Sequence, residues 1–253
     1  MTADVHVKPI GSVAILGLGP SLNQFIELAK RHGGKHVDEV WGINSLGDLF
    51  NCDRVFHMDD VRVQERRAQA NPEGNIARML EWLKKHPGPI YTSRKHPDYP
   101  GLVDFPLADL TNAFGQVYYN STAAYAIAMA LFLDVKRIEV YGFDFTYPNA
   151  HHAEKGRACV EFWLGLAVSR GIDVKVPHVS TLMDACEPEG RLYGYDTVDV
   201  KFTKSDSGLV HIDFAAKADE AIPTALEIEA RYDHNQHPNA LVAAANTSQP
   251  EAA

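Results

Sequence analysis

A buried strand that runs directly into a glycine-rich turn and a helix constrains the fold of this chain more than any other segment. The strand is expected over residues 12–18, and the turn reads GLGPS over residues 17–21. Apolar residues then recur at helical spacing over residues 21–32. Glycines in the turn allow a sharp bend and a close approach to a ligand. Ser21 is expected to cap the helix, whose first N–H groups suit a phosphate or carboxylate at the carboxyl end of the strand.

Strands and helices alternate along the chain up to about residue 180. A Pro- and Tyr-rich loop is expected over residues 95–106. Short apolar strands that alternate with helices predict an α/β fold, a Rossmann-like and mainly parallel sheet with helices on both faces. Right-handed crossovers bring the strand tips to one edge of such a sheet. Further strands are expected over residues 39–44, 54–58, 89–93, 136–145 and 172–177, and helices over 74–86, 123–133 and 153–170.

The pattern changes after about residue 190. Residues 198–203 and 209–214 alternate apolar and polar side chains with period two, which predicts a β-hairpin. We therefore expect a Rossmann-like nucleotide-binding domain over residues 1–189, a hairpin and short-helix appendage over 190–233, and a disordered tail over 234–253. An exposed hairpin edge favours pairing with a second copy, so a homodimer through the hairpin is expected.

Composition narrows the classes of partner. The net charge is −9 without a basic patch, which disfavours sequence-independent binding to nucleic acid. No apolar run approaches the roughly 20 residues of a membrane span, and the first residues do not resemble a secretory signal. The three cysteines are isolated in the sequence. They argue against a disulfide framework and are typical of a reducing cytoplasm.

Polar residues follow several of the expected strands. Asn44-Ser45, Asp59-Asp60 and Asp144 each stand at a strand tip. Paired carboxylates such as Asp59-Asp60 are suited to holding Mg²⁺ against phosphates. The alternative for this pair is a helix N-cap with an acidic first turn.

The turn departs from the dinucleotide-binding fingerprint. Its third glycine is missing, because position 22 is Leu, and no acidic residue stands cleanly at the tip of the second strand to hold a ribose. The sequence therefore disfavours NAD as the ligand.

The segment after Asp144 carries a second group of chemically capable side chains, Tyr147, His151, His152 and Arg157. A histidine there can act as a general base near neutral pH. Tyr147 and Arg157 are suited to stabilising a departing phosphate. The alternative is that the two histidines are an exposed pair and that Arg157 belongs to a solvated helix face with Glu154 and Glu161.

Three segments together resemble a known superfamily. They are GLGPSL at residues 17–22, Asn44-Ser45, and STAAYAIAMALFLDVKRIEVYGFDF at residues 121–145. They resemble bacterial sialyltransferases that use CMP-sialic acid, and equally the archaeal-type 6-hydroxymethylpterin diphosphokinases with their flagellin-modification relatives. The resemblance covers roughly residues 12–180. It implies a Rossmann-like fold and a nucleotide site.

The resemblance also implies roles for single residues. The nucleotide is expected at the glycine turn and at the polar residues after it, with Asp144 positioning the nucleotide or its ribose. A later histidine, His151 or His152, is expected to be the general base, and Tyr147 to support the leaving phosphate. The residues expected to hold the nucleotide are Gly17, Gly19, Pro20, Ser21, Asn44, Ser45, Ser121 and Asp144.

These observations favour a nucleotide-dependent group transferase. The preferred form is glycosyltransferase-like, with a nucleotide-sugar donor and a small-molecule or glycan acceptor. One alternative is a Mg²⁺-dependent diphosphokinase that acts on a pterin-like or nucleoside alcohol, with Asp59, Asp60 and Asp144 as metal ligands. Another alternative is a non-catalytic nucleotide-binding module.

Overall fold

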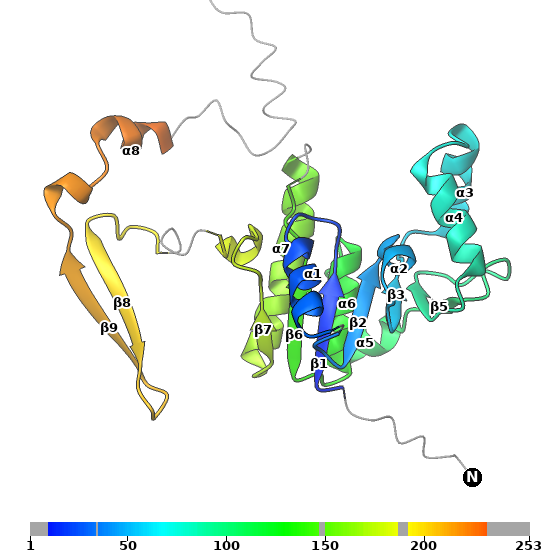
Figure 1. The fold of residues 1–253 in the computed structure, drawn as a ribbon, viewed down its shortest axis with the longest axis horizontal. Coiled ribbons are helices and arrows are strands. Elements are labelled where there is room, and N and C mark those ends of the chain that lie inside the picture. The colour runs from blue at the N-terminus through cyan, green and yellow to red at the C-terminus, as the bar shows by residue number, and fades with distance from the viewer. Residues whose placement is uncertain (1–9, 34, 147–149, 187–191, 232–253) are drawn as a thin grey trace, which may run out of the picture. The chain divides into compact units, whose positions relative to one another are not determined.

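The computed structural model describes residues 10–33, 35–146, 150–186 and 192–231. These fall into two compact units, a larger one that ends at Cys186 and a smaller one that contains the residues after it. The larger unit holds the sheet and the smaller unit holds the hairpin (Figure 1). The two units are therefore described separately.

The larger unit is built on a seven-stranded parallel sheet with the order β5-β4-β3-β2-β1-β6-β7. This confirms the predicted Rossmann-like architecture. The strand order reverses between β1 and β6, and open α/β sheets bind ligands at such a switch point. The expected loop over residues 95–106 is wrong in part, because it contains β5. The strands are β1 (Ser12–Leu16), β2 (Glu39–Ile43), β3 (Arg54–Phe56), β4 (Ile90–Thr92), β5 (Leu102–Asp104), β6 (Arg137–Tyr141) and β7 (Asp173–Lys175).

Helices cover both faces of this sheet, because the apolar side chains of β1 point alternately to one face and to the other. Successive side chains of a strand point to opposite faces. Val13 and Ile15 accordingly pack in the cluster with α6 and α7, whereas Ala14 and Leu16 pack in the cluster with α1 and α2. The helices of this unit are α1 (Leu22–Arg31), α2 (Leu46–Leu49), α3 (Val61–Ala70), α4 (Asn75–Lys85), α5 (Leu107–Phe114), α6 (Thr122–Phe132) and α7 (Ala150–Ser169).

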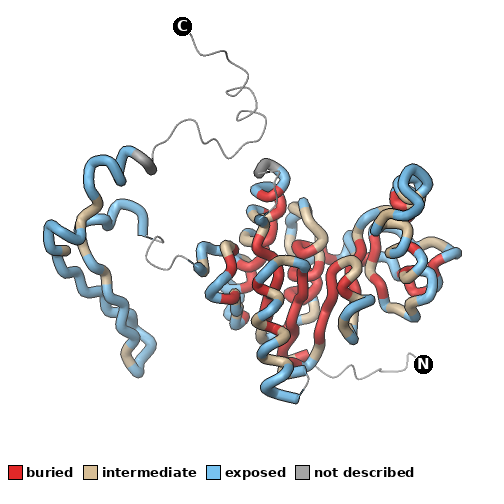
Figure 2. The backbone as a smooth tube through the Cα atoms, turned by 45° about the horizontal axis from the view of Figure 1, so that its top comes forward, coloured by how far each residue is buried: buried red, intermediate tan, exposed pale blue. Residues whose placement is uncertain are grey.

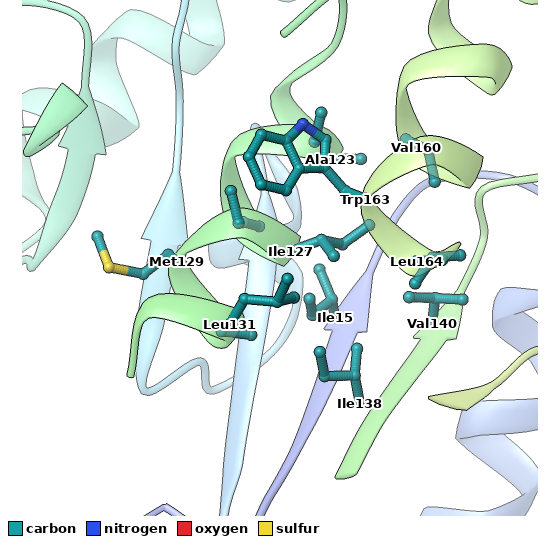
Figure 3. Packing of buried hydrophobic residues seen from close by; sticks show 14 of the residues in the cluster. Ile15, Ala123, Ile127, Met129, Leu131, Ile138, Val140, Val160, Trp163 and Leu164 are labelled. Atoms are coloured by element: carbon teal, nitrogen blue, oxygen red, sulfur yellow. The ribbon is translucent and has the colours of Figure 1, made fainter. Parts of the chain in front are cut away.

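Helix α6 lies at the centre of the core. Its residues from Ala123 to Leu131 are buried except Tyr125, which is half-buried. Its alanines keep the side-chain layer thin, and Ile127 and Leu131 lie over Ile15 and Ile138 of the sheet (Figure 3). Burial is concentrated on the sheet and on the helix faces that cover it (Figure 2). This burial fixes the position of the start of α6.

Helices α3 and α4 form a helical hairpin between β3 and β4. They lie side by side in Figure 1 and share a separate apolar cluster that contains Val61, Leu80 and Leu83. The opposite face of α3 is charged and exposed, and it carries Arg62, Arg66 and Arg67. This helical hairpin forms one wall of the site described below.

The smaller unit is an antiparallel hairpin of β8 (Val198–Lys204) and β9 (Val210–Ala216), followed by α8 (Ala225–Arg231). The predicted hairpin is confirmed, and every residue of β9 is exposed (Figure 2). A homodimer through this hairpin stays a prediction. The predicted tail over residues 234–253 lies outside the described residues. Among the helices that the structure describes, none has the length and apolar character needed to cross a membrane.

Candidate functional site

The tips of β1 and β6 are joined directly by the glycine turn. The Gly17 N–H donates to Tyr141 O at 2.7 Å, and the Gly19 N–H donates to Gly142 O at 2.8 Å. A Cβ added to Gly17 would lie 2.5 Å from Gly142 O, and one added to Gly19 would lie 2.9 Å from the same oxygen. Both glycines are therefore required by the packing of one strand tip against the other.

The side chain of Ser21 adds to these contacts between the tips of β1 and β6, which we call the seam. Its Oγ accepts a hydrogen bond from the Gly142 N–H at 2.7 Å, and its own N–H donates to Asp144 Oδ2 at 2.8 Å. Ser21 stands at the N-cap position of α1 but makes no side-chain capping bond, so the predicted capping role of that hydroxyl is wrong. The anion at the start of α1 is the carboxylate of Asp144. Pro20 lies exposed in the same turn.

Asp144 is buried, with 4% of its surface exposed, and its Oδ1 has no hydrogen-bond partner among the described residues. We expect Asp144→Ala to lower the free energy of unfolding by about 2–4 kcal/mol, because it leaves the buried Ser21 N–H unpaired. Asp144→Asn keeps an acceptor for that N–H and loses only the favourable charge at the helix start, about 1 kcal/mol. Urea unfolding curves measure both values. Equal losses for the two variants would contradict this role.

A pocket of about 350 Å³ opens beside the seam, and we call it the β1–β6 pocket. It brings together residues that are far apart in the sequence, from the tips of β1, β2, β3 and β6, the start of α6 and the first half of α7. Its polar side chains include those predicted at Asn44, Asp59, Ser121 and His152. The lining residues are Gly17, Leu18, Ile43, Asn44, Asp59, Asn120, Ser121, Thr122, Ala123, Gly142, Phe143, Phe145, His152 and Gly156.

The start of α6 faces this pocket through residues 120–123. Ser121 occupies the N-cap position with an extended backbone, but its hydroxyl makes no capping bond and lies 3.6 Å from Cys159 Sγ. Helices begin with N–H groups that lack intrahelical acceptors and that favour anions. The start of α6 is therefore the place in this pocket best suited to a phosphate.

Asn44 links the β1–β6 pocket to a buried histidine. Its backbone is left-handed, with φ 54°, and its Oδ1 lies 3.1 Å from Nδ1 of His57. His57 is fully buried, and its Nε2 has no partner among the described residues. Burial lowers the pKa of His57, against a smaller opposing effect of the Asp59 carboxylate. Sequence reasoning missed His57, although a lone polar ring in the apolar strand segment RVFHM was a usable signal.

A second pocket of about 520 Å³, the α3–α4 pocket, shares Leu18, Asn44 and Asp59 with the first. The β1–β6 pocket and the α3–α4 pocket thus meet at these three residues. The remaining lining residues come from α2, the end of β3 and the facing sides of α3 and α4. They are Ser45, Asp48, Leu49, His57, Gln64, Arg67, Asn75, Ile76, Arg78, Met79 and Trp82.

Two other predicted site residues, Asp60 and Arg157, line neither of these two pockets. Asp60 caps α3, with its Oδ1 accepting from the Arg62 N–H at 2.8 Å, while its neighbour Asp59 lies at the pockets. Arg157 forms an ion pair with Glu161 of the same helix, as the helix-face alternative has it, and a second one with Asp184, which lies outside that helix. Tyr147 and the side chain of His151 lie outside the described residues.

Metal ligands are sparse at this edge of the sheet. Within the described part of the chain, no cluster of three or more histidine, cysteine or acidic side chains has the geometry to hold a metal ion.

Searches of family models and of curated proteins find no match to this chain.

Proposed function

We propose that this chain is a nucleotide-dependent group transferase, glycosyltransferase-like in its chemistry, that uses a nucleotide-sugar donor. The observation that carries the proposal is the β1–β6 pocket. Asn44, Ser121 and His152 come from three distant segments and line one cavity at the switch point of a parallel sheet. Open α/β sheets bind their ligands at this place. The resemblance of residues 17–22 and 121–145 to nucleotide-dependent transferases supports the same class.

The nucleotide phosphate is proposed to lie at the start of α6. The N–H groups of Thr122 and Ala123 and the Ser121 hydroxyl would donate to its oxygens. Asn44 would contribute an amide from the opposite wall. Gly17 and Gly142 line the same cavity.

His152 is proposed to be the general base. It lies on α7, is exposed, and lines the same pocket as the start of α6. In the transfer step a hydroxyl oxygen of the acceptor forms a bond to the anomeric carbon of the sugar. The bond from that carbon to the nucleotide phosphate breaks, and its electron pair leaves with the phosphate. The hydroxyl proton passes to the imidazole.

The diphosphokinase alternative is supported by one observation, the position of Asp59 at the junction of the two pockets. A carboxylate there would hold Mg²⁺ together with donor phosphates, since Mg²⁺ uses few protein ligands and retains substrate and water oxygens. Chelation separates the two functions. It would abolish diphosphoryl transfer and leave a metal-independent glycosyl transfer unchanged.

A thermal-shift screen of the full chain tests the proposal. The ligands are CMP, CDP, UDP, GDP, ATP and pterins, each with and without Mg²⁺. A ligand at a hundred times its Kd stabilises the folded state by about 2.7 kcal/mol, so binding is expected as a clear rise in Tm. The absence of stabilisation by every nucleotide would overturn the transferase proposal and the nucleotide-binding-module alternative together.

A charge placed at the junction of the pockets should weaken nucleotide binding. Leu18 is 63% exposed and lines both pockets, so Leu18→Asp should leave folding intact. Its carboxylate would repel the nucleotide phosphates, and we expect a loss of affinity of about tenfold or more by calorimetric titration. Val63→Asp is the matched control, since Val63 is 55% exposed on α3 and lines neither pocket. Equal affinities for the two variants would place the nucleotide elsewhere.

A further inference from the structure

The α3–α4 pocket is lined by apolar side chains from one helix and by polar side chains from the strand tips. Ile76, Met79 and Trp82 belong to α4, and His57 and Asn44 lie at the strand tips. Trp82 is partly buried and belongs to the edge of the α3–α4 cluster. This pocket is larger than the β1–β6 pocket and meets it at shared residues. A molecule in the α3–α4 pocket would therefore adjoin a donor bound at the switch point.

Two arginines face this pocket without a carboxylate partner among the described residues. The Arg67 guanidinium donates to Gln64 Oε1 at 3.0 Å, and the Arg78 guanidinium donates to Asn75 Oδ1 at 2.6 Å. Both partners are neutral. Asp48 and Asp59 also line the pocket, and the described residues include no ion pair from either of them to these arginines. Some arginines elsewhere in this unit do pair with acids, as in Arg54–Glu39, Arg62–Glu65 and Arg157–Glu161.

Arg67 and Arg78 make no ion pair within the described residues, although the chain carries a net charge of −9. The remaining donors of Arg67 and Arg78 suit the oxygens of a carboxylate or phosphate, which a guanidinium can bind in bidentate fashion. Their position on the two helices of one hairpin places both charges on the same cavity. The pocket therefore offers an anion two guanidinium groups, on a lining that also holds the carboxylates of Asp48 and Asp59.

The buried ring of His57 is a third polar group at this pocket. Its Nδ1 pairs with Asn44 Oδ1 at 3.1 Å, while its Nε2 has no partner in the described part of the chain. A buried polar atom without a partner is unfavourable. The residue lines the pocket, so its ring lies beside the place of a bound molecule.

We propose that the α3–α4 pocket binds the acceptor substrate, a small molecule that carries a phosphate or carboxylate beside an apolar ring or chain. Arg67 and Arg78 bind the anionic group, and Ile76, Met79 and Trp82 contact the apolar part. A hydroxyl of the acceptor lies toward His57 and the junction with the donor pocket. The assignment of this molecule as the acceptor rests on the proposed function, whereas its chemical class rests on the pocket alone.

The test follows the indole N–H signal of Trp82 by ¹⁵N NMR on the full chain, assigned with Trp82→Phe. The probes are phenyl phosphate, phenylacetate and the neutral benzyl alcohol. A saturable shift is expected with an anionic probe, together with binding of benzyl alcohol that is at least about tenfold weaker. Trp41 and Trp163 are fully buried and serve as internal references. The proposal is overturned if neither anion produces a saturable shift, or if benzyl alcohol binds as tightly.

Matched arginine variants separate specific contacts from net charge. Arg67→Gln with Arg78→Gln is expected to weaken the anionic probe about tenfold or more. Arg31→Gln with Arg66→Gln removes the same charge from exposed positions on α1 and α3 that do not line the pocket, and it should leave probe affinity unchanged. Equal weakening by both pairs would overturn the proposal.

Nucleotide stabilisation distinguishes this inference from the proposed function. The Arg67/Arg78 variant should keep the Tm shift caused by the bound nucleotide, because its contacts lie in the other pocket. Nucleotide stabilisation without probe binding overturns the inference alone. Probe binding without nucleotide stabilisation overturns the transferase, and with it the role of the ligand as an acceptor.

Discussion

Gly142→Ala is expected to lower the free energy of unfolding of the larger unit by about 3–5 kcal/mol. Gly142 has φ +77°, a left-handed conformation that L-residues adopt only at a cost of about 1–2 kcal/mol. A Cβ at this position would also lie 2.0 Å from Gly17 O, a backbone atom that cannot rotate away. Relieving that overlap requires the tips of β1 and β6 to separate. Urea unfolding followed by the fluorescence of the buried Trp41 and Trp163 measures the loss.

Gly171→Ala is the matched control for this substitution. Gly171 has φ +78°, and a Cβ added there meets no atom within 4 Å. It should therefore show only the conformational cost, about 1–2 kcal/mol. The difference between the two variants isolates the close approach of the strand tips. Equal losses would show that the seam tolerates a side chain, and would contradict the requirement for glycine at this position.

The fold was predictable to the extent that periodicity along the chain reports burial. The apolar runs of β1, β2 and β6 and the helical spacing in α1 and α4 identify a parallel α/β sheet directly. Strand β5 was missed because Leu102–Asp104 is three residues long and follows a Pro-rich segment. Such a short strand exists because the neighbouring strand β4 supplies its partners, which no local pattern records.

The site was predictable in its residues but less so in their roles. Asn44, Asp59, Ser121 and His152 were identified from strand tips and motif resemblance, and they do line one pocket. The roles of Ser21 and Asp144 depend on hydrogen bonds to Gly142 and Ser21 across 121 and 123 residues of sequence. Local capping preferences cannot anticipate such contacts, because they describe only the residues next to a helix start.

The α3–α4 pocket illustrates the same limit. Arg67 looks like part of a solvated helix face in the sequence, and it is indeed exposed. Its placement opposite Arg78 arises from the packing of Val61, Leu80 and Leu83 on the hidden side of the helical hairpin. Tertiary packing therefore decides which exposed charges share a cavity.

His152→Ala is expected to lower the turnover of the proposed transferase by about 10²–10⁴-fold, the usual contribution of a general base. The assay follows release of free nucleotide from a nucleotide sugar that contains the nucleotide found to stabilise the chain, with water serving as the acceptor. Nucleotide affinity should change little, because the proposed phosphate contacts come from the start of α6. Folding should also be retained, since His152 is exposed on α7. A fall in turnover without a fall in affinity identifies a group that acts in the transfer step.

His32→Ala is the control for removing an imidazole from an exposed position, because His32 stands at the end of α1 and lines neither the β1–β6 nor the α3–α4 pocket. It should keep wild-type turnover. His152→Gln should behave like His152→Ala, since an amide retains hydrogen bonding but cannot accept the acceptor proton near neutral pH. Full turnover in both His152 variants, with nucleotide binding intact, would remove His152 from the mechanism. A wild-type chain that binds nucleotide but consumes no donor would instead favour the non-catalytic nucleotide-binding module.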